Sequence, residues 1–138
     1  MDYFKSTTVE LSYDQAIKKV TELLKDEGFG VLTEIDVKDT LKKKLDVDFK
    51  KYKILGACNP GFAHKALQAE DKIGTMLPCN VIVEENEDGT VEVSAVNPVA
   101  SMQAVSNDSL HPIAEQVRNK LEKVIKNLSK EAHKISIE

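Results

Sequence analysis

The sequence predicts an α+β fold: a mainly antiparallel sheet of about five strands, with two long helices packed on one face and two short helices in the connections. Two long amphipathic patterns, at 13–27 and 110–130, each present one apolar stripe. Five short segments have strand-like patterns, and residues 86–89 join two of them through a tight turn. Burying both stripes against one sheet is the economical arrangement for these elements.

The N-terminal segment predicts a strand followed by the first long helix. Residues 3–11 place alternate side chains on one face, as in a half-buried strand. Ser12 and Gln15 have the spacing of a capping box, which predicts a helix that starts at 13. Gly28 suits the left-handed residue that ends a helix.

A second strand is expected over 30–35, and Asp36 can cap a short helix that ends near 45. The residues of this short helix with buried spacing are Val37, Leu41 and Leu45. The third strand, 52–58, carries the non-alternating run 54–57, which indicates burial on both faces.

Asn59 and Pro60 indicate a short helix that continues to about 70, because asparagine caps free amides and proline fits the first turn. Its inward residues are expected to be Ala63, Ala66 and Leu67. Strands are then expected at 79–85 and 90–96, and residues 99–109 are expected to form a loop or turn. The last helix, 110–130, has the strongest helical periodicity in the chain.

Composition predicts one soluble domain over 1–138, since 41% of residues are hydrophobic and 30% are charged. The net charge of -4 argues against nucleic acid as the main partner. Segment 38–53 is a local exception, with seven lysines against three aspartates. A solvated helix face and loop explains this segment better than an anion site does.

The N-terminus has no pattern of a signal peptide, and no segment approaches the ~20 apolar residues of a membrane span. We therefore expect a cytoplasmic protein without a membrane partner, in which both cysteines are reduced.

Reactive side chains cluster in residues 52–83. Cys58 ends an apolar run and Cys79 begins one, so both are expected at strand ends, where they can face one pocket. Asn59 and Asn80 follow them and can fix the backbone, and His64, between the cysteines, is expected at the rim of the pocket.

Each of these residues also has a purely structural interpretation. Cysteine is often a small core residue, and a helix-surface position accounts for His64. The two thiols and this histidine are one ligand short of a closed tetrahedral zinc site, so the presence of any metal or cofactor stays unknown. Glu34 and Asp36 alternate on the second strand, which makes Glu34 a further ligand candidate.

Several stretches resemble the domain-of-unknown-function family 302. They are Gly-Phe-Gly-Val-Leu-Thr-Glu-Ile-Asp-Val (28–37), Ile-Leu-Gly-Ala-Cys-Asn-Pro (54–60), Ala-His-Lys-Ala-Leu (63–67), Leu-Pro-Cys-Asn-Val (77–81) and Val-Ser-Ala-Val-Asn-Pro (93–98). The resemblance covers nearly the whole chain. It implies a compact α+β domain that forms homodimers, and it brings no established activity.

Three functions remain open. The favoured one is a non-catalytic homodimer that binds a small ligand or soft metal near Cys58, His64 and Cys79. The second is a thiol-dependent enzyme or redox protein with Cys58 as nucleophile and His64 as possible base. The third is a structural module that binds a partner through segment 38–53 or a sheet edge. Because no complete catalytic motif is present, whether the chain is an enzyme is undecided.

Overall fold

A computed structural model describes the backbone of residues 1–137 and the side chains of residues 1–131. It contains one five-stranded sheet in the order β1-β5-β4-β3-β2, in which all neighbours are antiparallel. The strands are β1 (Phe4–Val9), β2 (Gly30–Asp36), β3 (Tyr52–Cys58), β4 (Cys79–Glu85) and β5 (Val91–Val96). This sheet, with its helices, confirms the predicted α+β fold.

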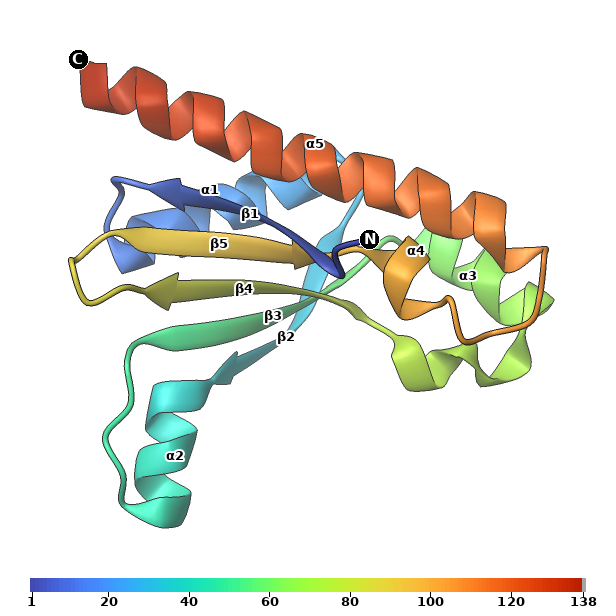
Figure 1. Cartoon of the computed structure of the whole chain (residues 1–138), viewed down its shortest axis with the longest axis horizontal. Helices are drawn as coiled ribbons and strands as arrows, with labels where there is room; N and C mark the ends of the chain where they lie inside the picture. Colours follow the sequence, from blue (N-terminus) through green and yellow to red (C-terminus); the bar gives the residue numbers. More distant parts are fainter. Residues whose placement is uncertain (138) are drawn as a thin grey trace.

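Two long helices, α1 (Tyr13–Asp26) and α5 (Leu110–Ile137), lie on the same side of the sheet, as Figure 1 shows. The shorter helices are α2 (Val37–Leu45), α3 (Pro60–Ala69), α4 (Pro98–Ser101) and the 3-10 helix η1 (Asp71–Met76). The sequence did not predict α4, which begins just before the expected loop 99–109, or η1. Within the described residues, we find no helix with the length and apolar character of a membrane span.

Local signals explain where α1 begins and ends. The Ser12 hydroxyl accepts a hydrogen bond from the Gln15 amide, and the Gln15 side chain accepts one from the Ser12 amide. This reciprocal capping box satisfies two amides that the first helical turn leaves free. Gly28 has a φ of +88°, the left-handed conformation that glycine adopts without strain. Both signals place α1 as predicted.

The core lies between the sheet and the two long helices. Alternate strand residues face the helices, so Leu55, Val81, Val83 and Val93 are fully buried. The apolar stripe of α5 meets them, with Leu121 at 1% exposure. The predicted stripes therefore bury against one face of the sheet.

The opposite side of the sheet, here called the open face, carries apolar side chains that are only partly buried or exposed. They belong to Phe4, Ile35, Tyr52, Ile54, Ile82 and Val96. Figure 1 shows no helix lying under the centre of this face within the described chain. The prediction that run 54–57 is buried on both sides is correct at Gly56, which lies against Thr33 and Pro78, and wrong at Ile54.

The expected burial of α2 is wrong. Among the described residues of this helix no side chain is buried, and Leu45 is 66% exposed. The physical reason is its position, because α2 projects from the ends of β2 and β3 on the side away from α1 and α5 (Figure 1). The contacts of α2 with β2 and β3 leave Val37 and Leu41 half-buried and Leu45 exposed.

Candidate functional site

A pocket of about 290 Å³ lies at the end of the sheet where β3 stops and β4 begins. Its walls come from β2, β3, β4, α3 and α5, with Pro98 of α4 and Met102 at one end. Apart from the Asn59 amide and two thiols, the described side chains that line it are apolar. Such a cavity suits a ligand that is mainly hydrophobic.

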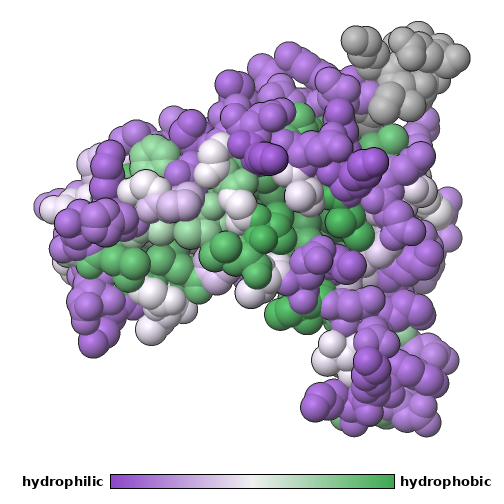
Figure 2. Space-filling model, turned by 180° about the vertical axis from the view of Figure 1, so that it is seen from behind, coloured by the Kyte–Doolittle hydropathy of each residue, from purple (hydrophilic) through white to green (hydrophobic). Residues whose placement is uncertain are grey.

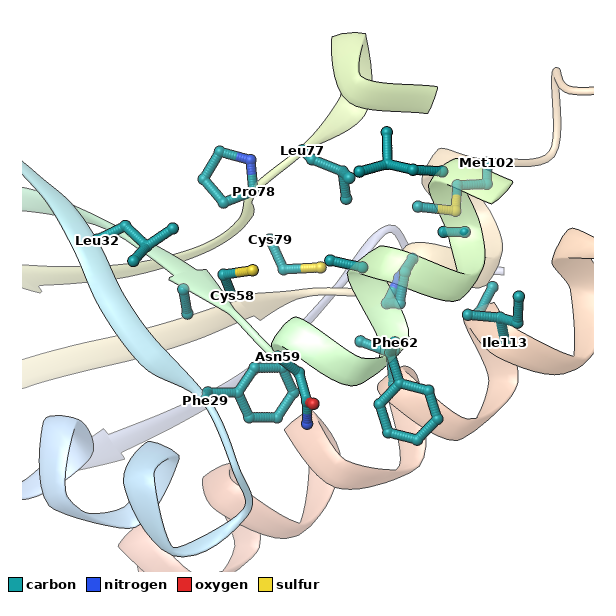
Figure 3. Close-up of a pocket in the computed structure, with 17 residues that line it drawn as sticks. Phe29, Leu32, Cys58, Asn59, Phe62, Leu77, Pro78, Cys79, Met102 and Ile113 are labelled. Atoms are coloured by element: carbon teal, nitrogen blue, oxygen red, sulfur yellow. The ribbon is translucent and has the colours of Figure 1, made fainter. Parts of the chain in front are cut away.

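Cys58 and Cys79 both line this pocket, and both are free and partly exposed. Figure 3 shows the two sulfur atoms pointing into the same space, with Pro78 above them and Phe29 below. The sheet register explains this proximity, because Cys79 pairs with Ala57, the residue before Cys58. The structure therefore brings the two thiols to one site at adjacent strand ends.

Asn59 also lines the pocket, but its role differs from the predicted helix cap. In the described part of the chain its side chain makes no capping hydrogen bond to α3. Its Nδ2 instead donates a hydrogen bond of 3.2 Å to the backbone carbonyl of Glu27, next to Gly28. The amide therefore ties the start of α3 to the end of α1, beside the pocket.

The environment of Cys79 keeps its thiol protonated. Burial raises the pKa of Cys79 to about 11, and the nearby Cys58 adds a smaller effect in the same direction. A thiolate is the reactive form of cysteine, so this shift makes Cys79 a poor nucleophile at neutral pH. Cys79 behaves as part of an apolar wall.

We expect the alkylation rate of Cys79, measured in a Cys58→Ser variant, to keep rising with pH up to at least pH 10. The raised pKa leaves only a small thiolate fraction below that pH. Iodoacetamide labelling followed by mass spectrometry measures the rate. A matched control carries Thr8→Cys, an exposed position, with both native cysteines replaced by serine. Its rate should level off above about pH 9, and a similar plateau for Cys79 would contradict the raised pKa.

The same shift links this thiol to stability. An unfolded cysteine loses its proton near pH 8.5, whereas Cys79 in the folded chain keeps its proton until about pH 11. Its stabilising contribution is therefore complete below about pH 8.5 and is lost as the pH rises toward 11.

Three predicted site residues lie elsewhere. His64 is exposed on α3 and is not among the residues that line the pocket. Asn80 is exposed on the open face, because successive residues of β4 point to opposite sides of the sheet. Glu34 is exposed on β2, near Tyr13. Burial is the main cause that raises the pKa of Tyr13 to about 12. The negative charges of Asp36, Asp14 and Glu34 add smaller effects in the same direction.

Most of the pocket wall was missed by the sequence interpretation. The missed residues include Phe29, Phe62, Leu77, Pro78 and Met102. They come from segments that are far apart in the chain, so no local spacing connects them. One available signal was the apolar residues before each cysteine, such as Leu77 and Pro78 before Cys79.

The thiol pair is not part of a larger ligand cluster. Among the residues whose side chains the structure describes, no group of three His, Cys, Asp or Glu could hold a metal ion. Of the His, Cys, Asp and Glu side chains, the pocket therefore offers a metal only the thiols of Cys58 and Cys79. A closed structural zinc site needs four ligands.

Comparison with known proteins gives the family. A family model described as "Domain of unknown function DUF302" matches residues 5–128. The chain belongs to the DUF302 family. This confirms the resemblance seen in the sequence, and the match includes both cysteines and the whole sheet except Phe4.

Two similar proteins, one known from its crystal structure and one from its sequence, are both described as uncharacterised. A crystal structure of an uncharacterised conserved DUF302 protein from Bacillus stearothermophilus is similar with a TM-score of 0.85 and 28% identity. That similarity covers 91% of this chain and 98% of the other. An uncharacterised protein of Aquifex aeolicus (strain VF5) is 32% identical over 74 residues, 54% of this chain. The matched region spans 51% of the length of that curated relative.

Proposed function

We propose that this DUF302 protein is a non-catalytic binding protein that takes a small, mainly apolar ligand into the pocket beside Cys58 and Cys79. The observation that carries the proposal is the pocket itself, a cavity of about 290 Å³ with almost entirely apolar walls. Ligand sites are commonly about 300–1,000 Å³, so this cavity lies at the lower limit and suits only a small molecule.

The surface around the pocket supports the same proposal. Leu32 and Leu67, which line the pocket, are 68% and 43% exposed. Figure 2 shows hydrophobic surface gathered across the middle of the face opposite to the view of Figure 1. Exposed apolar side chains that continue into a cavity let an apolar ligand enter without crossing a charged rim.

The alternatives are less well supported. A thiol enzyme with Cys58 as nucleophile needs a base that can take the proton of that thiol. Its suggested base, His64, does not line the pocket. A soft-metal site would rely on the two thiols, because the described His, Cys, Asp and Glu side chains give no third ligand. The apolar ligand therefore remains the preferred form of the proposal.

Filling the pocket tests this function. Ala66 is 3% exposed and lines the pocket, whereas Gln68 is exposed on the same helix. We expect Ala66→Phe to weaken binding of the fluorescent probe 1-anilinonaphthalene-8-sulfonate, whose aromatic rings enter apolar pockets, by at least about tenfold. Gln68→Phe, which adds the same ring outside the pocket, should bind the probe as the wild type does.

Native mass spectrometry of the purified wild type gives a second readout, because a retained small molecule should disappear in Ala66→Phe and persist in Gln68→Phe. Circular dichroism checks that both variants are folded. Equal probe binding by folded Ala66→Phe and the wild type would sink the proposal.

We also propose that the protein is a homodimer. The support is the open face, which leaves apolar side chains of the sheet without a covering layer in the described chain. A single sheet normally packs against a second layer on any face that is apolar.

A further inference from the structure

We propose that the open face of the sheet binds the arm of a second copy of this chain, where the arm is α2 with the loop that follows it, residues 37–51. This inference rests on the proposed homodimer and names its surface. Both halves of the contact are present on one chain, so a two-fold axis lets each copy give its arm and receive its partner's.

The arm has apolar side chains that stay exposed in the described chain. Leu45, Val47 and Phe49 are 66%, 43% and 39% exposed. These three lie at the end of α2 and in the following loop, on an element that projects away from the helices of the core (Figure 1). Clustered exposed apolar residues on a projection indicate an interaction surface.

The open face has matching chemistry. A groove of about 420 Å³ on it is lined by aromatic and aliphatic side chains, among them Phe4, Tyr52 and Ile82. Glu84 and Glu92 line the same groove and lie directly opposite each other on β4 and β5. Two like charges in this position repel each other, so added positive charge stabilises the pair.

The arm carries that positive charge. It contains six lysines against three aspartates, and one of the lysines pairs with the open face of its own chain. Lys50 Nζ lies 2.6 Å from Glu84 Oε1 within one chain, and also lies 5.9 Å from the centre of the Tyr52 ring. Among residues 1–131, Glu92 has no ion-pair partner, so it is available to a lysine of the partner's arm.

Pairing through the edge strand β2 is less favoured. Its ladder with β3 is irregular between Val31 and Thr33, and such a bulge twists an edge strand away from regular pairing. The face and the arm have no comparable obstacle. A contact between these two surfaces also buries the apolar residues of both at once.

The test measures the dimer dissociation constant of the full chain by sedimentation equilibrium. Ile82→Asp places a charge on the open face, and Val47→Asp places one on the arm, in a loop where it does not disturb an element. We expect each to raise the dissociation constant at least about 100-fold. Leu32→Asp is the matched control, since this residue is 68% exposed but belongs to neither surface, and it should change the constant by less than about threefold.

Charge gives an independent readout. Glu84→Lys with Glu92→Lys should weaken the dimer more than the double Gln variant, because the new lysines repel the basic arm. Raising the salt concentration from about 0.05 to about 0.5 M should weaken the wild-type dimer as well. Circular dichroism verifies that each variant is folded. If Ile82→Asp does not fold, Val47→Asp still tests the contact.

The outcomes separate the proposals. A wild-type chain that stays monomeric at high micromolar concentration overturns the homodimer and this surface, but leaves ligand binding intact. A dimer that Ile82→Asp and Val47→Asp leave unchanged overturns this surface alone. A dimer broken only by Leu32→Asp would place the contact at the pocket rim, which also overturns it.

Discussion

Replacing Leu121 by alanine should lower the free energy of unfolding by about 2–5 kcal/mol. Leu121 is 1% exposed in α5 and belongs to the core cluster between that helix and the sheet. The substitution removes buried methyl groups and leaves a cavity that close-packed neighbours fill only in part. Urea denaturation followed by circular dichroism measures the change.

A matched control is Leu32→Ala, which removes the same atoms from a side chain that is 68% exposed. It should change the free energy of unfolding by less than about 0.5 kcal/mol. If Leu121→Ala shifts the denaturation midpoint no more than Leu32→Ala does, α5 is not packed on the sheet as described.

Replacing Gly56 by valine should cost roughly 1–3 kcal/mol or more, because this position has no room for a side chain. A Cβ atom there would overlap Thr33 Oγ1 and would lie 2.9 Å from Pro78 Cγ. The strand partner β2 and the pocket wall at Pro78 would both have to move. We therefore expect Gly56→Val to weaken probe binding as well as stability.

Gly30→Val is the control in the same sheet, since a Cβ atom at Gly30 meets no described atom within 4 Å. A double-mutant cycle with Gly56→Ala and Thr33→Ala tests the close approach of Gly56 to Thr33 separately. Removing the Thr33 hydroxyl should recover part of the loss caused by Gly56→Ala, because the two residues share one space. Additive effects would contradict the close approach.

Much of the fold is readable from the sequence because its signals are periodic or local. Leu121 and its neighbours repeat at helical spacing, and Ser12 with Gln15 marks the start of α1. Those signals depend on residues a few positions apart. The burial of Leu45 was predicted by the same periodicity and is wrong, because periodicity identifies an apolar side of a helix but not what covers it.

The candidate site was predicted less well. Cys58 and Cys79 line one pocket, because the register pairs Cys79 with Ala57, and Cys58 follows at the end of β3, just before α3. Asn80 points to the other side of the sheet, because a single step along a strand reverses the side chain. The bond from Asn59 to the Glu27 carbonyl joins residues 32 positions apart, a pairing that no local pattern encodes.

The strand order has a consequence for synthesis of the chain. β1 is paired with β5 alone, in a register that joins Phe4 to Val96. At ~5–20 residues per second, a ribosome takes on the order of 5–20 s to make the residues between them. During that interval β2, β3 and β4 can already pair with their neighbours in sequence order. The first strand to be made is therefore expected to be the last to join the sheet.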